Sequence, residues 1–198
     1  RGRTHLAVAI GADCLGGDLV PSEEREDAAA LRALTEGLVL GSFSYTDPFA
    51  YYSNDGANGS GAYDSGSWTG PDTNLQFGFN ELVASWNAAT PDGTWIQVEV
   101  QPKMLDGHWA KSYILGRWSS SDSDFHRTSV GGQGDADGFV SIDTWFAKDH
   151  PAVAYRLKVT LFRRAGSTAT PTLTRLNAVA MNLTNQKNYT GYSGVLSS

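Results

Sequence analysis

The side chains of this sequence best suited to binding chemistry are tryptophans that alternate with amides and carboxylates. In TWIQVEV, residues 94–100, the period-2 geometry of a strand places Trp95, Gln97 and Glu99 together on one face. Flat aromatic rings stack on the C–H surfaces of sugars, while amides and carboxylates bond to hydroxyl groups. The pattern predicts a carbohydrate-binding face around Trp95.

The segment FVSIDTWF, residues 139–146, repeats this arrangement. Alternation predicts that three apolar side chains face inward: Val140, Ile142 and Phe146. Trp145 and Asp143 then face outward as further binding candidates. Both outward tryptophans also fit a second interpretation, in which an irregular segment or a neighbouring domain covers them. Trp86 and Trp118 are expected in the core.

An acidic loop precedes that segment and suggests a cation site. Asp135 and Asp137, followed by a glycine, match part of a calcium-loop pattern. The complete loop needs Asp or Asn where Gln133 stands and an acid where Thr144 stands. Asp135 and Asp137 are therefore the candidate calcium ligands. The alternative is an Asp-Gly turn that leads into a strand.

No catalytic residue can be assigned from the sequence. Cys14 is the only cysteine, so no intramolecular disulfide can form, and a thiol nucleophile needs a base beside it. His126 lies near Ser129, but a hydrolytic triad is defined by three-dimensional geometry rather than by spacing. We predict that this chain alone is not an enzyme and, apart from calcium, that it holds no cofactor.

Strands joined by turns must position these side chains. The clearest alternation places five residues inward: Val153, Tyr155, Leu157, Val159 and Leu161. Asp106-Gly107 is a hairpin signal between two strand-like runs. Because regular strands follow one another without helices from Leu75 onward, the sequence predicts an antiparallel, jelly-roll-like β-sandwich.

The first 40 residues differ from the rest of the chain. THLAVAI reads as a strand, and PSEEREDAAALRALTEG reads as a helix that begins at Pro21-Ser22 and ends at Gly37. We therefore divide the chain into an N-terminal strand and helix segment, a β-sandwich domain and a C-terminal tail or linker: residues 1–40, 41–185 and 186–198.

Composition excludes several partners. The 198 residues carry a net charge of −6, and no basic stripe is present, so nucleic acid is not an expected partner. The sequence contains no run of about 18 apolar residues, so membrane insertion is not expected. The 22 glycines and the 11% of aromatic residues favour strands with tight turns.

Several short motifs occur here in an order that resembles a known protein region: Tyr45–Phe49, Ser85-Trp86-Asn87, Gly93-Thr94-Trp95, Gly116-Arg117-Trp118 and Gln133-Gly134-Asp135. The chain resembles the β-rich region upstream of the catalytic domain in secreted, actinobacterial proteins of the C39-like cysteine peptidase family. The resemblance covers roughly residues 38–183. In that family a papain-like domain with a nucleophilic cysteine and a histidine follows this region.

The resemblance implies no catalytic residue within this chain, because Cys14 lies in the part that does not match. The chain begins at Arg1 and is expected to be a fragment or a processed product. We expect a secreted, extracellular, non-catalytic binding module that takes a glycan or cell-wall polymer and works beside a downstream catalytic domain. Two alternatives stay open: a fragment of a cysteine peptidase, and a structural domain of a surface assembly.

Overall fold

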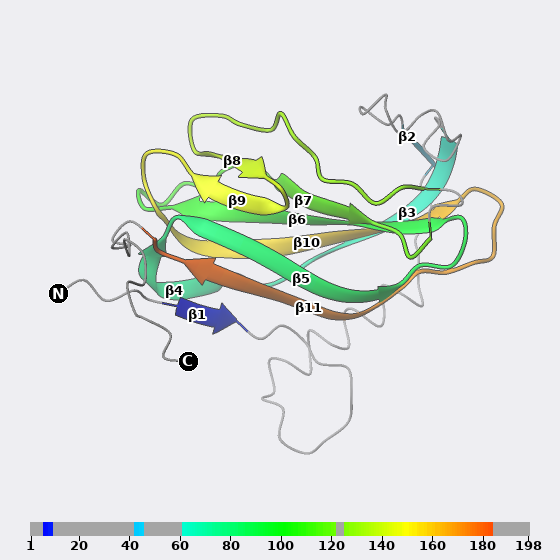
Figure 1. The fold of residues 1–198 in the computed structure, drawn as a ribbon, viewed down its shortest axis with the longest axis horizontal. Helices are drawn as coiled ribbons and strands as arrows, with labels where there is room; N and C mark the ends of the chain where they lie inside the picture. The colour runs from blue at the N-terminus through cyan, green and yellow to red at the C-terminus, as the bar shows by residue number, and fades with distance from the viewer. Residues whose placement is uncertain (1–5, 10–41, 46–60, 122–124, 184–198) are drawn as a thin grey trace, which may run out of the picture.

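The computed structural model describes four stretches of the chain: residues 6–9, 42–45, 61–121 and 125–183. Within them the chain forms two antiparallel β-sheets (Figure 1). The prediction of a mainly β, sandwich-like fold is confirmed, whereas the jelly-roll arrangement stays a prediction. The expected helix over residues 21–37 lies outside the described residues. In the described part of the chain no helix is long and apolar enough to cross a membrane.

Sheet one has five strands. Their order across the sheet is β1 (Leu6–Ala9), β11 (Thr172–Met181), β5 (Glu81–Ala89), β9 (Thr144–Ala147) and β8 (Gly138–Ser141). The predicted THLAVAI strand is thus present as β1, which pairs with β11. The predicted division of the chain near residues 40 and 185 is untested and stays a prediction.

Sheet two has six strands. The order is β2 (Ser42–Tyr45), β3 (Gly61–Thr69), β10 (Ala152–Arg164), β6 (Thr94–Met104) and β7 (Tyr113–Trp118), with β4 (Thr73–Phe79) paired to β10 outside this order. The predicted hairpin at Asp106-Gly107 joins β6 to β7, and Gly107 has the positive φ of 95° that such a turn requires of glycine.

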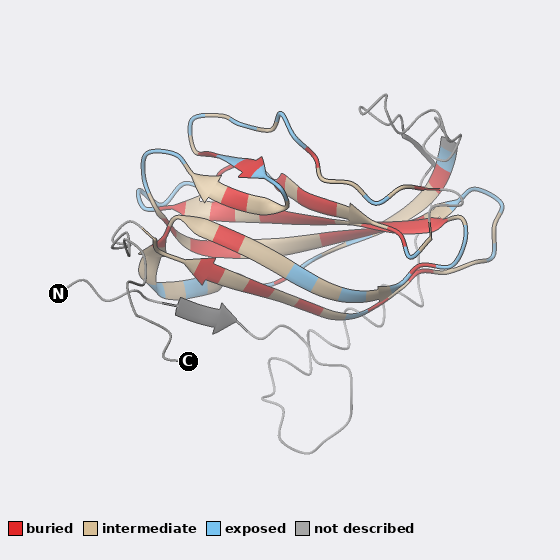
Figure 2. Cartoon of the chain, viewed as in Figure 1, coloured by how far each residue is buried: buried red, intermediate tan, exposed pale blue. Residues whose placement is uncertain are grey.

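Apolar residues between the sheets form the core, and Figure 2 shows them as buried bands along the central strands. On β10 the predicted inward residues Tyr155, Val159 and Leu161 are buried. Val153 is only half-buried, because a β-bulge between Ala152 and Ala154 shifts the register there. Leu157 is also only half-buried, although it packs against the core, so the alternation gives the inward face of β10 without burying every residue on it.

Candidate functional site

The ring of Trp95 is fully buried, although it lies on the face of β6 that the sequence assigns to solvent. Its centroid is 3.7 Å from that of Phe162 and 4.3 Å from that of Phe125, with all three rings nearly parallel. Since two parallel rings cannot share one face, the two phenylalanines occupy both faces of Trp95. Of the two interpretations of Trp95, the structure agrees with the one in which an irregular segment covers the ring, because the connection between β7 and β8 brings Phe125 over it.

The two polar neighbours of Trp95 on β6 bond to adjacent strands. Glu99 is buried, and its Oε2 lies 3.2 Å from Nζ of Lys158 on β10. Gln97 Oε1 accepts a hydrogen bond of 2.9 Å from Nε of Arg117 on β7. These contacts stabilise the outer face of sheet two and leave no aromatic platform beside the amide and the carboxylate.

Trp145 is also fully buried, contrary to the outward placement predicted for it. Segment 138–147 is a hairpin of β8 and β9, and Ile142 and Asp143 form its two-residue turn with φ of 45° and 61°. Val140 and Trp145 are opposite each other in register and therefore share the inward face. Ile142, predicted inward, is 85% exposed at the turn. The predicted faces of Ile142 and Trp145 are wrong because the alternation of inward and outward side chains does not continue through a turn.

Asp135 is held by donors of the protein. Its Oδ1 accepts hydrogen bonds from the hydroxyl of Tyr113 at 2.5 Å and from the backbone N–H groups of Asp137 and Gly138. Nζ of Lys111 lies 3.3 Å from Oδ2. Burial alone would raise the pKa of Asp135, but the hydrogen bonds from Tyr113 and the two amides lower it overall. This carboxylate fixes the loop that leads into β8.

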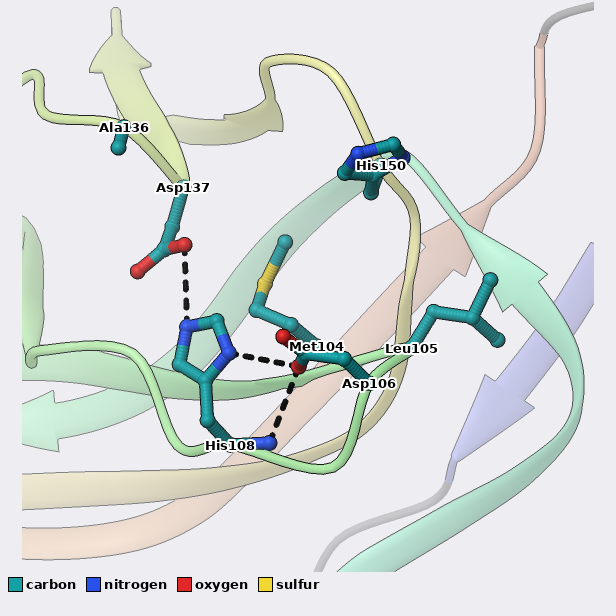
Figure 3. A pocket seen from close by; sticks show the side chains of 7 residues that line it. All are labelled: Met104, Leu105, Asp106, His108, Ala136, Asp137 and His150. Atoms are coloured by element: carbon teal, nitrogen blue, oxygen red, sulfur yellow. Dashed lines mark hydrogen bonds and ion pairs between the residues drawn. The ribbon is translucent and has the colours of Figure 1, made fainter.

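Asp137 lines a cavity of about 330 Å³ at the β6–β7 turn. Figure 3 shows the ring of His108 between two carboxylates, with Nε2 3.0 Å from Asp137 Oδ1 and Nδ1 2.6 Å from Asp106 Oδ1. Hydrogen bonds to Asp137 and then to Asp106 raise the pKa of His108 above its ordinary value. The His108 ring and the carboxylates of Asp106 and Asp137 are thus hydrogen-bonded to one another.

The acidic loop shows no cation geometry of its own. Among the residues that the structure describes, no group of three or more His, Cys, Asp or Glu side chains is arranged to hold a metal ion. Asp135 and Asp137 bond to Lys111 and His108, whereas calcium needs six or more oxygen ligands. Calcium binding at these two residues remains a prediction.

A pocket of about 250 Å³ opens where β7 of sheet two lies beside β5 and the β8–β9 turn of sheet one. Figure 1 shows β8 and β9 beside β7 on this side of the molecule. We call this pocket the edge pocket. Aromatic, charged and hydroxyl-bearing residues from four segments line it, together with one glycine: Trp86, Gly116, Arg117, Trp118, Arg127, Thr128, Ser129 and Asp143.

The backbone creates the space of the edge pocket. A Cβ at Gly116 would lie 3.0 Å from the Trp86 ring, which is a tight contact, and 3.8 Å from Cγ of Asp143, which is an ordinary van der Waals contact. Arg117 and Thr128 exchange two backbone hydrogen bonds of 3.0 Å, which fix the irregular segment at the pocket mouth. The pocket is therefore shaped by strand geometry rather than by a free loop.

One atom in the edge pocket lacks a protein partner. Asp143 Oδ1 is buried, and no described residue donates a hydrogen bond to it. A buried acceptor without a donor costs about 1–3 kcal/mol, and more when the group is charged. The Arg127 guanidinium lies 5.2 Å above the Trp118 ring and is exposed to solvent. Asp143 Oδ1 is thus an unsatisfied acceptor within the wall of the pocket.

The sequence indicated some of the residues at this site. Asp143, a predicted binding residue, lines the edge pocket, whereas its predicted neighbour Trp145 faces the core. Trp86 and Trp118 were expected in the core, and both do pack against the cluster that contains Ile96, yet they also line the pocket. The sequence did not indicate Arg127 as a pocket residue, because it lies in an irregular segment, where no periodicity assigns a side chain to a face.

The two sheets and the edge pocket define a sandwich-like β domain with an aromatic, polar pocket at one edge. A family model described as Peptidase C39 N-terminal domain matches residues 21–181. The chain belongs to this family, and the resemblance drawn from its motifs is confirmed.

Other comparisons add little. No curated protein matches this chain. A solved structure titled "Structure of infectious bursal disease virus Gt strain" matches with 10% sequence identity and a TM-score of 0.38. The match covers 92% of this chain and 33% of that chain, so this chain spans about a third of its length. So low a similarity supports no argument about fold or function.

Proposed function

We propose that this domain is a non-catalytic binding module of a C39-like peptidase family protein, and that it binds a glycan or cell-wall polymer in the edge pocket. The observation that carries the proposal is the edge pocket itself, whose lining brings Trp86 and Trp118 together with the half-buried carboxylate of Asp143. A sugar hydroxyl group would donate to this carboxylate while the apolar faces of the sugar ring contact tryptophan.

The size of the edge pocket sets how much of a polymer it takes. Its volume of about 250 Å³ is below the roughly 300–1,000 Å³ typical of sites for drug-sized ligands. We therefore propose that it holds about one sugar ring, with the rest of the polymer outside. Thr128 and Ser129 supply further polar groups at the rim.

The proposed site replaces most of the residues that the sequence indicated. Trp95 and Trp145 are fully buried, so neither ring is open to a ligand. Gln97 and Glu99 bond to Arg117 and Lys158. Asp143 alone is kept from the earlier set, and Trp86 and Trp118 take the role of the stacking residues.

The biological setting belongs to the same proposal. A module of this family would work outside the cell and hold a downstream cysteine peptidase domain close to a polymer. Catalysis would then reside in that domain, and the edge pocket would serve binding alone.

The test is a binding screen against glycans and cell-wall polysaccharides, followed by tryptophan fluorescence with and without calcium. We expect saturable quenching by one polymer class. Asp143→Asn keeps the shape of the side chain and removes its charge, so we expect at least tenfold weaker binding, about 1.4 kcal/mol. Asp149→Asn, at an exposed residue outside the pocket, serves as the matched control and should bind like the wild type.

Two outcomes would reject the proposal. A flat fluorescence response across the whole panel would mean that no polymer of these classes binds. Equal affinity of the wild type and Asp143→Asn would place any binding outside the edge pocket.

A further inference from the structure

Positively charged residues outnumber negatively charged ones in the edge pocket. Its lining contains Arg117 and Arg127 but only one acidic residue, Asp143, so the two positive charges and one negative charge leave a local excess of one positive charge. We propose that the edge pocket selects an acidic glycan, whose carboxylate or phosphate group accepts hydrogen bonds from the Arg127 guanidinium. This inference rests on the proposed function, since it names the ligand class of the same pocket.

Arg127 is the residue that contacts the acidic group in this proposal. Its side chain is exposed, and its guanidinium forms no hydrogen bond or ion pair with any residue that the structure describes. The N–H groups of the guanidinium are therefore open to a ligand. Their planar, forked arrangement matches two oxygens of a carboxylate or a phosphate group, and such charge-assisted hydrogen bonds are stronger than neutral ones.

The Trp118 ring keeps this guanidinium at the pocket. The guanidinium lies 5.2 Å from the centre of the ring, which is within the range of a cation–π attraction. This attraction acts on the positive charge and does not require the N–H groups as hydrogen-bond donors. Because Arg127 is already held against the pocket wall, less side-chain freedom is lost when a ligand binds to it.

Neighbouring residues of the lining add to the preference for an anion. Thr128 Oγ1 donates to the backbone oxygen of Ser129 at 3.0 Å, whereas the Ser129 hydroxyl group has no hydrogen-bond partner among the described residues. Ser129 is thus a second donor at the pocket. Arg117 already donates from Nε to Gln97, so we expect it to act mainly through its charge.

Two negative charges oppose an acidic ligand. Asp143 repels an anion, but in the proposed function it accepts a hydroxyl group of the same sugar, so the acidic group has to lie on the Arg127 side of the pocket. The whole chain carries a net charge of −6. Charges farther away than about 8 Å are largely screened at physiological salt, so the arginines of the lining dominate at the site.

The experiment compares tetragalacturonic acid with its methyl ester by calorimetry, at low and at moderate salt. The ester keeps the sugar rings and hydroxyl groups but has no negative charge. We expect the wild type to bind the acid at least about fivefold more tightly than the ester, with a preference that falls as salt rises. An oligomer of glycerol phosphate is the third ligand: binding that depends on Arg127 identifies a phosphate as the acidic group, and its absence identifies a carboxylate.

One substitution and one control show whether Arg127 makes the selection. Arg127→Gln removes the guanidinium from an exposed position, so we expect the preference for the acid to fall to about twofold or less. Arg164→Gln removes one positive charge from an exposed residue on β10 outside the pocket. This control should keep the preference of the wild type.

The outcomes separate this inference from the proposed function. If the acid and the ester bind with equal affinity and Asp143→Asn weakens both, the edge pocket is a sugar site and the preference for acidic groups is wrong. A preference that is unchanged in Arg127→Gln would overturn the role of the guanidinium. If neither tetramer nor the phosphate oligomer binds but a neutral polymer of the panel does, this inference fails and the proposed function stands; if nothing in the panel binds, both fail.

Discussion

Trp95 illustrates how the burial of one residue decides its role. Alternation along β6 correctly places its side chain opposite Ile96, which packs in the core between the sheets. Exposure depends on what the rest of the chain brings to that face, and here Phe125 and Phe162 cover the ring. Sequence periodicity gives the direction of a side chain, but the covering group comes from a connection without periodicity.

Truncation of this ring should therefore affect stability rather than ligand binding. We expect Trp95→Ala to lower the free energy of unfolding by about 3–5 kcal/mol, because it leaves a cavity among parallel rings. Leu105→Ala, at a side chain that is 61% exposed, should change it by no more than about 0.5 kcal/mol. Urea denaturation of both variants measures the difference.

A contrary result would be informative for this residue. If Trp95→Ala unfolded at the wild-type urea concentration and lost polysaccharide binding, the ring would act as a stacking surface for the ligand rather than as a packing residue.

Most of the features that the sequence did not predict lie in the connections between strands. The strands themselves, their antiparallel pairing and the β6–β7 hairpin follow from alternation and from the Asp106-Gly107 turn signal. The Ile142–Asp143 turn lacks such a signal, since two-residue turns with positive φ favour Asn and Gly over a β-branched residue. The turn was therefore read as strand, and every side chain after it was placed on the wrong face.

The β6–β7 turn should show a pH dependence through His108. Only the doubly protonated ring donates to both Asp137 and Asp106, and these hydrogen bonds raise the pKa of His108 above 6.5. The contribution of the protonated His108 ring to the stability of the fold is thus complete below pH 6.5, and it is lost as the pH rises through the raised pKa of His108. The side chain is 47% exposed, so solvent limits this contribution.

Nuclear magnetic resonance titration of the His108 ring checks this expectation. The midpoint should lie above 6.5 in the wild type and move downward in Asp137→Asn, which keeps the shape of the partner but removes its charge. His150→Gln, at the other histidine of the cavity, is the control and should leave the midpoint above 6.5. A wild-type midpoint at or below 6.5 would contradict the bridged geometry.

At the scale of the whole molecule, the pairing of distant segments creates the candidate site. Strand β5 pairs with β11 and β9 in one sheet, while β7 pairs with β6 in the other, so Trp86 and Trp118 meet only after both sheets have formed. The sequence indicated the sheets and the family. It did not indicate the edge pocket, because a pocket between two sheets depends on how they pack.

The central claim is that a glycan binds between the two sheets at the edge pocket. The most direct measurement is a map of chemical-shift changes in ¹⁵N-labelled protein, titrated with the tightest-binding oligosaccharide of the screen. We predict saturable shifts of the Trp86 and Trp118 indole N–H signals and of the Asp143 amide, with the Trp95 indole signal unchanged. Shifts that cluster instead around the His108 cavity, or none at saturating ligand, would contradict the account.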